Sequence, residues 1–373
     1  MRISNILALS VKELRSLARD PVMIALIVYA FSVAIYTGAT AIPDTLNKAP
    51  IAIVDEDRSA LSTRIVGAFY PPYFTPPIIT TLAKMDSLMN SGVITFALDI
   101  PPDFQRDVLA GDRPTIQLNV DATRISQAYS GAGYVETIVA TEVAAFLQRY
   151  RAVATLPIEL ALRTRFNPTL NRTWFGAVVE IINQITMLSM VLTGAALIRE
   201  REHGTIEHLL VMPVTPFEIM VSKVVAMGLV VLVASAVSLV VIVQIILSMP
   251  IQGSVALFLA GAAFNLFATT SLGIFLATTA RSMPQFALLF ILVALALEML
   301  SGGMTPRESM PWLVRDIMLV APTTHFIVLA QNILFRGSGF SVVWPQFLAL
   351  GVIGAALFGI ALARFRKTIS EMQ

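Results

Sequence analysis

The chain has 373 residues, of which 56% are hydrophobic and 13% are charged, and it contains no cysteine. Soluble domains carry about 45–50% apolar and about 25% charged residues. This composition, with a mean hydropathy of +0.76, therefore excludes a disordered chain, a coiled coil and an ordinary soluble enzyme. The net charge of +2 gives no indication of a nucleic-acid partner, and without cysteine there is no disulfide or thiolate metal site. The composition indicates a polytopic membrane protein.

Five stretches with at most one charged residue each are long enough to cross a bilayer, which takes about 20 apolar residues. The stretch 224–280 has 57 residues and as one helix would be about 85 Å long, so we expect two helices separated at Pro250, Gln252 and Gly253. The sequence thus predicts a polytopic α-helical membrane protein with six transmembrane helices, the first in 21–42 and five more in 173–363. The five apolar stretches are 22–42, 173–198, 224–280, 282–303 and 337–363.

Basic residues are unevenly distributed between the two sides of these predicted spans. Eleven lie in the N-terminal segment, in the links after the second and fourth helices and in the C-terminal tail, whereas the links 250–253 and 304–341 hold three. Lys and Arg are enriched in short cytoplasmic loops. We therefore expect both termini, including the tail 364–373, in the cytoplasm and the segment 304–336 as an outer re-entrant or loop segment.

The segment 43–172, between the first and second helices, has the length and charge of a folded domain. It carries 12 basic and 13 acidic residues, and so long a loop can be translocated almost regardless of its charge. We expect an extracytoplasmic α/β domain, with 70–77 as a stiff exposed connection. The predicted strands are 51–54, 94–100 and 115–120, and the predicted helices are 59–69, 104–110 and 125–151.

The first 20 residues have an amphipathic helical pattern that precedes the first span. Apolar residues recur along one face, with Lys12, Arg15 and Arg19 elsewhere, which is typical of a helix on the cytoplasmic membrane surface. Ala39-Thr40-Ala41 has the form of a signal-peptidase site, so a cleaved signal is the alternative. The apolar run of 21 residues is longer than the 7–15 typical of a signal peptide and favours a retained span.

The link 199–218 combines a charged cluster with a turn and a helix start. Gly204 permits a sharp change of direction, Thr205–Met212 can form about two helical turns, and Thr215, Pro216 and Glu218 have the pattern of a capping box with proline at the first helical position. A short polar-faced helix at this place is a surface that a soluble subunit can grip. The alternative is a charged link that only fulfils the positive-inside rule.

Three motifs resemble the ABC-2-type permeases, the membrane subunits of a class of ATP-binding-cassette exporters. The first is the link 199–219 with Lys223, which is similar to that family's charged cluster, Gly-Thr, Glu, Leu and Pro-x-Thr-Pro pattern. The second comprises 300–306, 310–312 and 322–325, and the third is 100–104 followed by Gly111. The resemblance implies a permease subunit that exports substrate with ATP hydrolysed by a separate chain.

The family resemblance also implies partners, location and site residues. The partners are ABC ATPase subunits that hold ATP and Mg²⁺, a second permease copy in a homodimer or paralogous heterodimer, membrane lipid, and a periplasmic adaptor at the large outer domain. The location is the bacterial inner membrane, with multiple spans. The residues expected to couple to the ATPase are Glu200, Arg201, Glu202, Gly204, Thr205 and Glu207.

Polar residues inside the predicted spans are candidates for a substrate path, because such residues are costly in lipid and usually face the interior of a bundle. Glu180, Asn183 and Gln184 share one face of the second helix, and Glu298 on the fifth helix lies in the same outer half of the bilayer by the rise per residue. Asn265 and Thr269 form a second pair. Hydrogen bonds between helices are the alternative role for all of these residues.

No catalytic or cofactor motif accompanies these features. The chain lacks the G-x-x-x-x-G-K-[ST] phosphate loop, so we expect it to bind no cofactor or metal and to have no enzymatic activity of its own. An integral-membrane glycan or lipid transferase is the runner-up, against which the lack of a cluster of acidic and histidine residues at one aqueous site argues. A non-transporting membrane scaffold is the third hypothesis.

Overall fold

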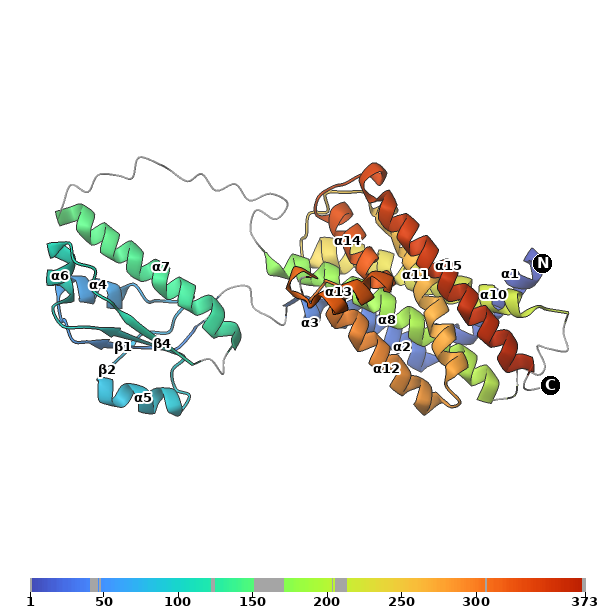
Figure 1. Cartoon of the computed structure of the whole chain (residues 1–373), viewed down its shortest axis with the longest axis horizontal. Helices are drawn as coiled ribbons and strands as arrows, with labels where there is room; N and C mark the ends of the chain where they lie inside the picture. The colour runs from blue at the N-terminus through green and yellow to red at the C-terminus, as the bar shows by residue number, and fades with distance from the viewer. Residues whose placement is uncertain are drawn as a thin grey trace. The chain divides into compact units, whose positions relative to one another are not determined.

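The computed structural model describes residues 2–40, 46, 48–121, 125–150, 171–202, 204, 213–305 and 307–370. The chain divides into two compact units, Met1–Ala41 with Thr164–Gln373 and Ile42–Arg163, each described here by itself (Figure 1). The predicted helix Thr205–Met212 lies outside the described residues.

Within the described residues of the first unit, six helical segments are long and apolar enough to cross a membrane. This agrees with the prediction of a polytopic helical protein with about six spans, and the bent helix pair described below would make a seventh if it crosses as one span. The break predicted near Pro250 is confirmed as well, because η2 ends at Ile246 and α11 begins at Val255. The segments are α2 (Pro21–Tyr29) with η1 (Ala30–Ala34) and α3 (Ile35–Thr40), α8 (Arg172–Glu202), α10 (Pro216–Ser238) with η2 (Leu239–Ile246), α11 (Val255–Thr279), α12 (Met283–Leu300) and α15 (Phe340–Ser370).

Helix α8 is the central helix of this bundle. In its most apolar stretch 78% of the residues are buried, against 17% for α12 and 22% for α15. Glycine allows α8 and α11 to approach closely: a Cβ atom on Gly273 would lie 2.6 Å from the carbonyl oxygen of Met190. Small residues at crossings of this kind are typical of packed membrane helices. The backbones of α8 and α11 are therefore in close contact at this crossing.

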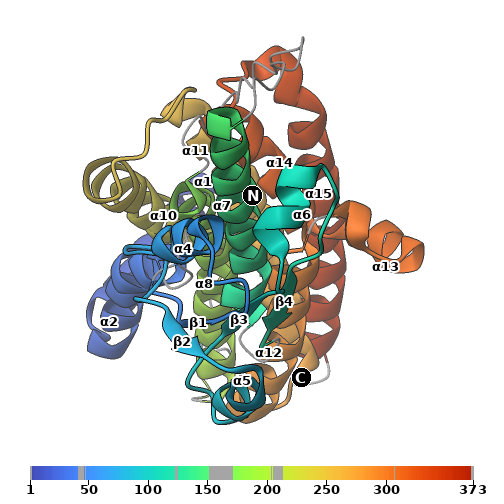
Figure 2. The ribbon, with the colours of Figure 1, turned by 90° about the vertical axis from the view of Figure 1, so that its left-hand side faces the viewer.

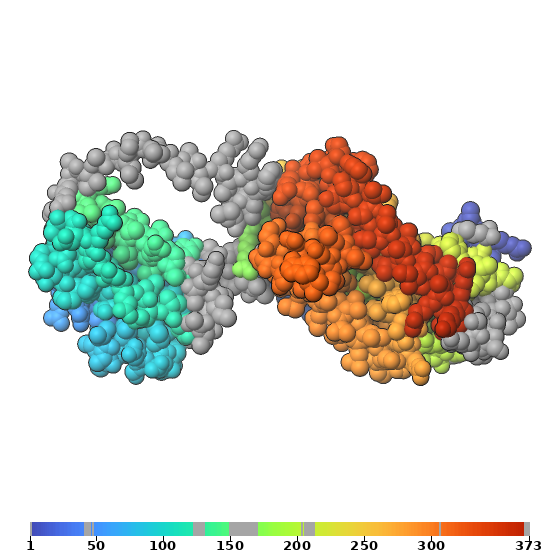
Figure 3. Space-filling model, in the orientation of Figure 1, coloured from blue at the N-terminus to red at the C-terminus, as the bar shows by residue number. Residues whose placement is uncertain are grey.

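Two π-helical segments and a bent helix pair interrupt the regular bundle. The segments η1 and η2 have π-helical hydrogen bonding, which the hydropathy pattern does not reveal. Between α12 and α15, α13 (Trp312–Ile317) with η4 (Met318–Val320) meets α14 (Pro322–Leu334) at 87°, the geometry of a broken span or a re-entrant loop. Trp312, Leu313 and Ile317 of α13 are exposed, and this helix stands out on the face in Figure 3.

The second unit is an α/β fold with a four-stranded sheet of order β2-β1-β3-β4. Strand β1 is parallel to β2 and β3, with Ala52 opposite Ile78 and Ala97, and β3 is antiparallel to β4 with Leu98 opposite Leu118. The elements are β1 (Ile51–Asp55), α4 (Ala60–Gly67), β2 (Ile78–Thr80), α5 (Leu82–Asn90), β3 (Phe96–Ile100), α6 (Phe104–Ala110), β4 (Gln117–Val120) and α7 (Ile125–Tyr150).

Alternating side chains of the central strands build two cores on the two faces of the sheet. Ile51 and Ile53 pack with residues of α4, α6 and α7, whereas Ala52 and Val54 pack with Met85 of α5. The sheet therefore lies between α4 and α7 on one face and α5 on the other (Figures 1 and 2). Because the central strands are covered on both faces, all four of these side chains are buried.

The predicted strands and helices of this unit are confirmed, but β2 and α5 are not among the predictions. Strand β2 has three residues, too few for a hydrophobic period to appear. The prediction of 70–77 as an exposed connection is wrong at Phe74, which is fully buried. Its ring packs edge-on against Phe69 and Phe96, with centroids 5.1 and 6.1 Å away. An aromatic side chain in a proline-rich turn therefore completes the core.

Candidate functional site

The candidate site is the charged end of α8, residues Arg199–Glu202, which we call the α8 hub. Four consecutive charged side chains on a helix point in different directions, since successive residues are about 100° apart. Each of these four contacts a different part of the first unit: the junction of α1 and α2, the pair α1 and α10, the end of α11, and the start of α12. The end of the central helix is therefore attached to five other helices.

Glu200 belongs to a group of four charged side chains that we call the four-charge cluster. The Glu200 carboxylate is 2.7 Å from Lys223 Nζ and 2.5 Å from Lys12 Nζ, and Lys223 Nζ is also 3.0 Å from Glu13 Oε1. The side chain of Lys223 is 2% exposed and that of Glu13 is 7% exposed. Two lysines and two glutamates balance their charges, as buried ionic groups require. The cluster joins α1 (Ile3–Ala18), α8 and α10.

Lys12 is the exposed member of the four-charge cluster. Partial burial alone would lower the pKa of Lys12, but the hydrogen bond to Glu200 and the charges of Glu200 and Glu13 raise this pKa above its ordinary value. The ammonium is therefore charged at neutral pH and contacts Glu200 Oε1, while Lys223 contacts Oε2 of the same carboxylate.

Arg199 connects the α8 hub to the start of the first span. Its guanidinium donates to Asp20 Oδ2 at 2.8 Å, and Asp20 caps α2 by accepting from the backbone N–H groups of Met23 and Val22. The Met23 N–H and the Arg199 guanidinium lower the pKa of Asp20, although partial desolvation opposes them. One carboxylate thus serves as helix cap and as partner of the hub.

Arg201 and Glu202 connect the hub to α11 and α12. Arg201 donates to the carbonyl oxygens of Ala280 at 2.7 Å and Ala277 at 3.4 Å, the acceptors left open at the end of α11. Glu202 accepts a hydrogen bond of 2.8 Å from the backbone N–H of Met283, the first residue of α12. Both side chains engage helix ends that otherwise lack intrahelical partners.

Helix α1 is held against the beginning of α10. Ser10 donates to the carbonyl oxygen of Ser222 at 3.2 Å, and the backbone N–H of Arg2 donates to Glu218 Oε1 at 2.7 Å. Glu218 also completes a capping box with Thr215, which confirms the helix start predicted there. The opposite face of α1 exposes Ile3, Leu7 and Val11, an apolar surface of the kind that lies on a bilayer.

Among the residues predicted to couple to an ATPase, Glu200, Arg201 and Glu202 form the hub with Arg199. Gly204 follows the hub with φ +67°, and no atom of the described residues lies within 4 Å of an added Cβ, so the chain turns there in a conformation that favours glycine. Thr205 and Glu207 lie outside the described residues.

Sequence analysis missed the roles of Glu13, Lys12 and Lys223. The signal was present for Glu13, which follows Ile6, Leu9 and Ser10 at helical spacing and shares their buried face. An acidic residue on a buried helix face requires a cation. The sequence does not indicate that this cation is Lys223, because the two residues are 210 positions apart.

The predicted path residues on α8 and α11 lie together in the bundle interior. Ser189 and Thr269 share a hydrogen bond of 2.6 Å, and Asn265 Nδ2 lies 3.4 Å from Thr186 Oγ1. Asn265 and Thr269 are fully buried, and Asn183 is 4% exposed. Among the described residues, neither Asn183 Nδ2 nor Asn265 Oδ1 has a hydrogen-bond partner. These side chains form a polar seam between α8 and α11.

Glu180 and Glu298 form a separate acidic pair. Glu180 accepts a hydrogen bond of 2.6 Å from Gln184 and packs over Gly38 of α3, where an added Cβ would lie 3.0 Å from its carboxyl carbon. Glu180 and Glu298 are near enough for their charges to interact, and both side chains are half-buried. Neither acid takes part in the hydrogen bonds of the polar seam described above.

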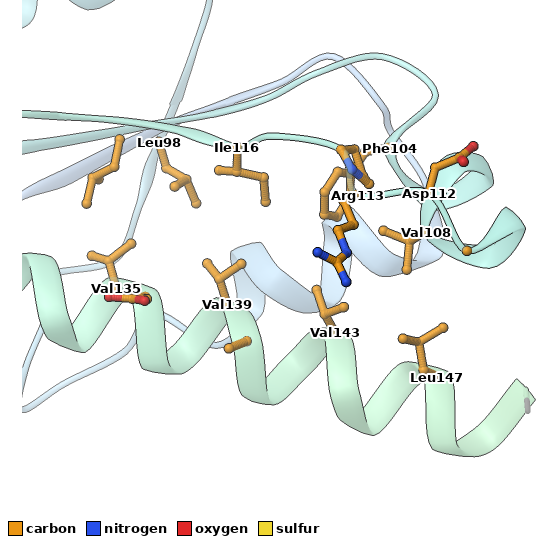
Figure 4. Close-up of a pocket in the computed structure, with 15 residues that line it drawn as sticks. Leu98, Phe104, Val108, Asp112, Arg113, Ile116, Val135, Val139, Val143 and Leu147 are labelled. Carbon is orange, nitrogen blue, oxygen red and sulfur yellow. The ribbon is translucent and has the colours of Figure 1, made fainter. Parts of the chain in front are cut away.

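The second unit contains a cavity of about 600 Å³ between α7 and the sheet (Figure 4). One face is lined by Val135, Val139, Val143 and Leu147, which recur every four residues along α7. The Arg113 guanidinium points toward α7, whereas the carboxylate of the neighbouring Asp112 points away (Figure 4). The volume lies within the range of small-molecule pockets.

Comparison with known proteins agrees with the resemblance noted in the sequence. The chain is 60% identical over 370 residues to the inner membrane transport permease YhhJ of Escherichia coli (strain K12), covering 99% of both chains. It is 27% identical over 362 residues to the "Probable multidrug ABC transporter permease YbhR" of the same organism, covering 96% of this chain and 97% of that protein. Residues 22–363 match the profile of the ABC-2 family transporter protein. The chain therefore belongs to the ABC-2 family of transporter proteins.

Proposed function

We propose that this chain is the permease subunit of an ATP-driven exporter in a bacterial inner membrane. A separate ABC ATPase subunit binds ATP and Mg²⁺ and acts on the link 203–212. The α8 hub, which directly precedes this link, transmits the movement to the helices that it contacts. The attachment of Arg199–Glu202 to α1, α2, α10, α11 and α12 is the observation that carries this proposal.

The proposed orientation of the bundle places the ATPase on the cytoplasmic side, and export is what the resemblance to ABC-2-type exporters implies. The hub, α1 and the C-terminal end of α15 lie in the cytoplasm, so the α/β unit lies outside it. A second copy of the chain, or a paralogue, completes the path, and a periplasmic adaptor contacts the α/β unit. The polar seam and the pair Glu180 and Glu298 supply the polar groups of the bundle interior that an exported molecule meets.

The test is transport by the reconstituted complex of this chain with its ABC ATPase. Ethidium, an apolar cation, is a suitable first probe because the relative YbhR is named as a multidrug permease. ATP-dependent ethidium movement that requires both subunits is the expected result. ATP-independent movement, or none with a panel of apolar cations, anions and neutral compounds, would contradict the proposal.

Variants of the hub test the mechanism separately from folding. Glu202→Ala removes the acceptor at the first residue of α12, and Glu207→Lys reverses a charge in the link. Both are expected to leave the complex assembled and hydrolysing ATP while lowering transport severalfold. Arg15→Gln, on the exposed part of α1, is the matched control. Parental transport rates in both variants would remove the hub from the mechanism.

A further inference from the structure

Cations from three separate segments converge on a second cavity, of about 400 Å³, at the hub end of the bundle. Arg201 comes from the end of α8, Arg281 from the link between α11 and α12, and Arg364 and Lys367 from α15. Thr279 and Thr368 add hydroxyl groups to the same wall. All four charged residues that line the cavity are basic, so its chemistry is that of an anion site.

The cavity lies where the bundle would meet the lipid headgroups. Three candidate membrane spans end at Glu202, Thr279 and Thr368, and a fourth begins at Met283. Arg201, Arg281 and Lys367 are each within two residues of one of these ends, and Arg364 precedes Thr368 by four residues, about one helical turn. The lining is therefore at the level of the interface, where the phosphate groups of phospholipids lie.

The geometry of the individual cations suits one shared anion. Arg364, Lys367 and Thr368 have the spacing i, i+3 and i+4, which places them on one face of α15. The Arg364 guanidinium lies over the ring of Phe275 of α11, with its Cζ 5.9 Å from the ring centroid. Arg201 uses two N–H groups on carbonyl oxygens of α11, and a guanidinium has five such donors.

The positive-inside rule alone does not account for this convergence. That rule is satisfied by basic residues anywhere in a cytoplasmic loop, as it is by Arg366, which also belongs to the end of α15 but does not line the cavity. The acidic residue whose charge interacts with Arg201 is Glu202, which does not line the cavity. Its carboxylate accepts a hydrogen bond from the backbone N–H of Met283.

We propose that this cavity binds the phosphate group of an anionic phospholipid from the cytoplasmic leaflet. The choice of leaflet rests on the orientation proposed above; the binding does not depend on transport. A phosphate held by Arg201, Arg281 and Arg364 would join the ends of α8, α11 and α15. Because Arg201 is also a member of the α8 hub, the lipid would stabilise the arrangement through which the hub acts.

The experiment measures lipid retention by the purified full chain in detergent, without an ATPase subunit. Phosphatidylglycerol and phosphatidylcholine are titrated and the retained lipid is counted by native mass spectrometry. Wild-type chain is expected to retain phosphatidylglycerol in preference to phosphatidylcholine. Arg281→Gln and Arg364→Gln should each weaken phosphatidylglycerol binding about fivefold, the usual contribution of one cation near a membrane surface.

Controls separate this site from general charge attraction and from misfolding. Arg366→Gln makes the same charge change on the same helix end and should alter binding less than about twofold. Arg281→Gln alters an exposed side chain, so its effect is independent of the Phe275 contact that Arg364→Gln removes. Equal retention of the two lipids, or equal weakening by all three variants, would overturn the proposal. Displacement of phosphatidylglycerol by millimolar inorganic phosphate would overturn the lipid as the source of the phosphate.

Discussion

Lys223 Nζ lies 2.7 Å from Glu200 Oε2 and 3.0 Å from Glu13 Oε1, on a side chain that is 2% exposed. One ammonium group thus connects the central helix α8 with α1, the helix that precedes the first span. Removing one partner of a buried ionic group is costly because the remaining charges stay buried without compensation. The position of Lys223 therefore makes it the most sensitive member of the four-charge cluster.

We expect Lys223→Met to lower the free energy of unfolding by about 3–5 kcal/mol, because Glu13 and Glu200 would then share only Lys12. Chemical unfolding of the purified chain in detergent measures this change. Lys12→Met, at a side chain that is 47% exposed, should cost about 0–1 kcal/mol. Adding Glu13→Gln to Lys223→Met restores the charge balance and should recover part of the loss. Equal effects of the two lysine variants would contradict the burial argument.

Gly204 provides a second test, of backbone conformation. Its φ of +67° costs a residue with a Cβ about 1–2 kcal/mol, although among the described residues no atom lies within 4 Å of an added Cβ. Gly204→Ala should therefore lower ATP-coupled transport severalfold, and Gly204→Asn, which tolerates this region better, should lower it less. Gly359→Ala in α15, where φ is ordinary and the space is open, is the control. Identical transport by the Ala and Asn variants would show that the turn does not need this conformation.

The elements that sequence predicts well are those with a long period or a specific local motif. The five apolar stretches, one of them long enough for two helices, and the capping box at Thr215 depend on residues that are neighbours in the sequence, so the pattern is visible without the fold. Phe74 was misjudged because its burial is produced by Phe69 and Phe96 from other elements. The π-helical segment η2 escaped prediction because π and α helices have the same apolar composition.

The same distinction between local motifs and long-range contacts applies to the candidate site. Glu200, Arg201 and Glu202 were singled out from a local motif, and the structure shows the contacts that each makes inside the bundle. The four-charge cluster required Glu13 and Lys223 to be recognised as partners across 210 positions, and nothing local in either residue's surroundings specifies that pairing. Sequence therefore indicated where the hub begins but not how many helices it joins.

The orientation of the chain can be tested by cysteine labelling, since the chain has no native cysteine. Ser87→Cys in α5 and Arg366→Cys in α15 both replace exposed side chains. In intact spheroplasts a membrane-impermeant maleimide should modify the cysteine at position 87 and spare the one at 366, and lysis should expose both. Ser87 is preferred to Ser59, whose hydroxyl caps α4. Protection of position 87 with labelling of position 366 would contradict the proposed orientation and the cytoplasmic location of the hub.

The polar seam between α8 and α11 allows a quantitative prediction, the coupling energy between Ser189 and Thr269. Ser189→Ala and Thr269→Val each remove one partner of a 2.6 Å hydrogen bond. A double-mutant cycle in detergent should give a coupling energy of about 0.6 kcal/mol, with an upper limit of about 1.7 kcal/mol, as found for buried hydrogen bonds between membrane helices. A coupling energy of zero would mean that the contact is replaced by others when either partner is lost.

Variants of Glu180 and Glu298 test whether the bundle interior is a substrate path or only a packed core. A carboxylate that faces a wet cavity stays ionised and attracts a cationic molecule, whereas in a dry interior its charge costs a few kcal/mol. Glu180→Gln and Glu298→Gln keep the size and a hydrogen-bonding end while removing the charge. If the pair lines the path, both Gln variants should lower ethidium export severalfold while the unfolding temperature stays close to the parental value.

Glu180→Leu extends the comparison, because it also removes the acceptor of the Gln184 hydrogen bond over Gly38. If the two acids serve only to hold helices together, the Gln variants should export at the parental rate and Glu180→Leu should mainly lower the unfolding temperature. Export of ethidium, an anionic probe and a neutral probe should be measured for each variant, since loss of an attracting carboxylate lowers only the export of the cation. A uniform loss of export for all three probes would instead indicate a damaged bundle. Parental export rates for every variant would direct the search for the path to Asn183 and Asn265. Among the described residues, each of these two buried amide groups has one atom without a hydrogen-bond partner.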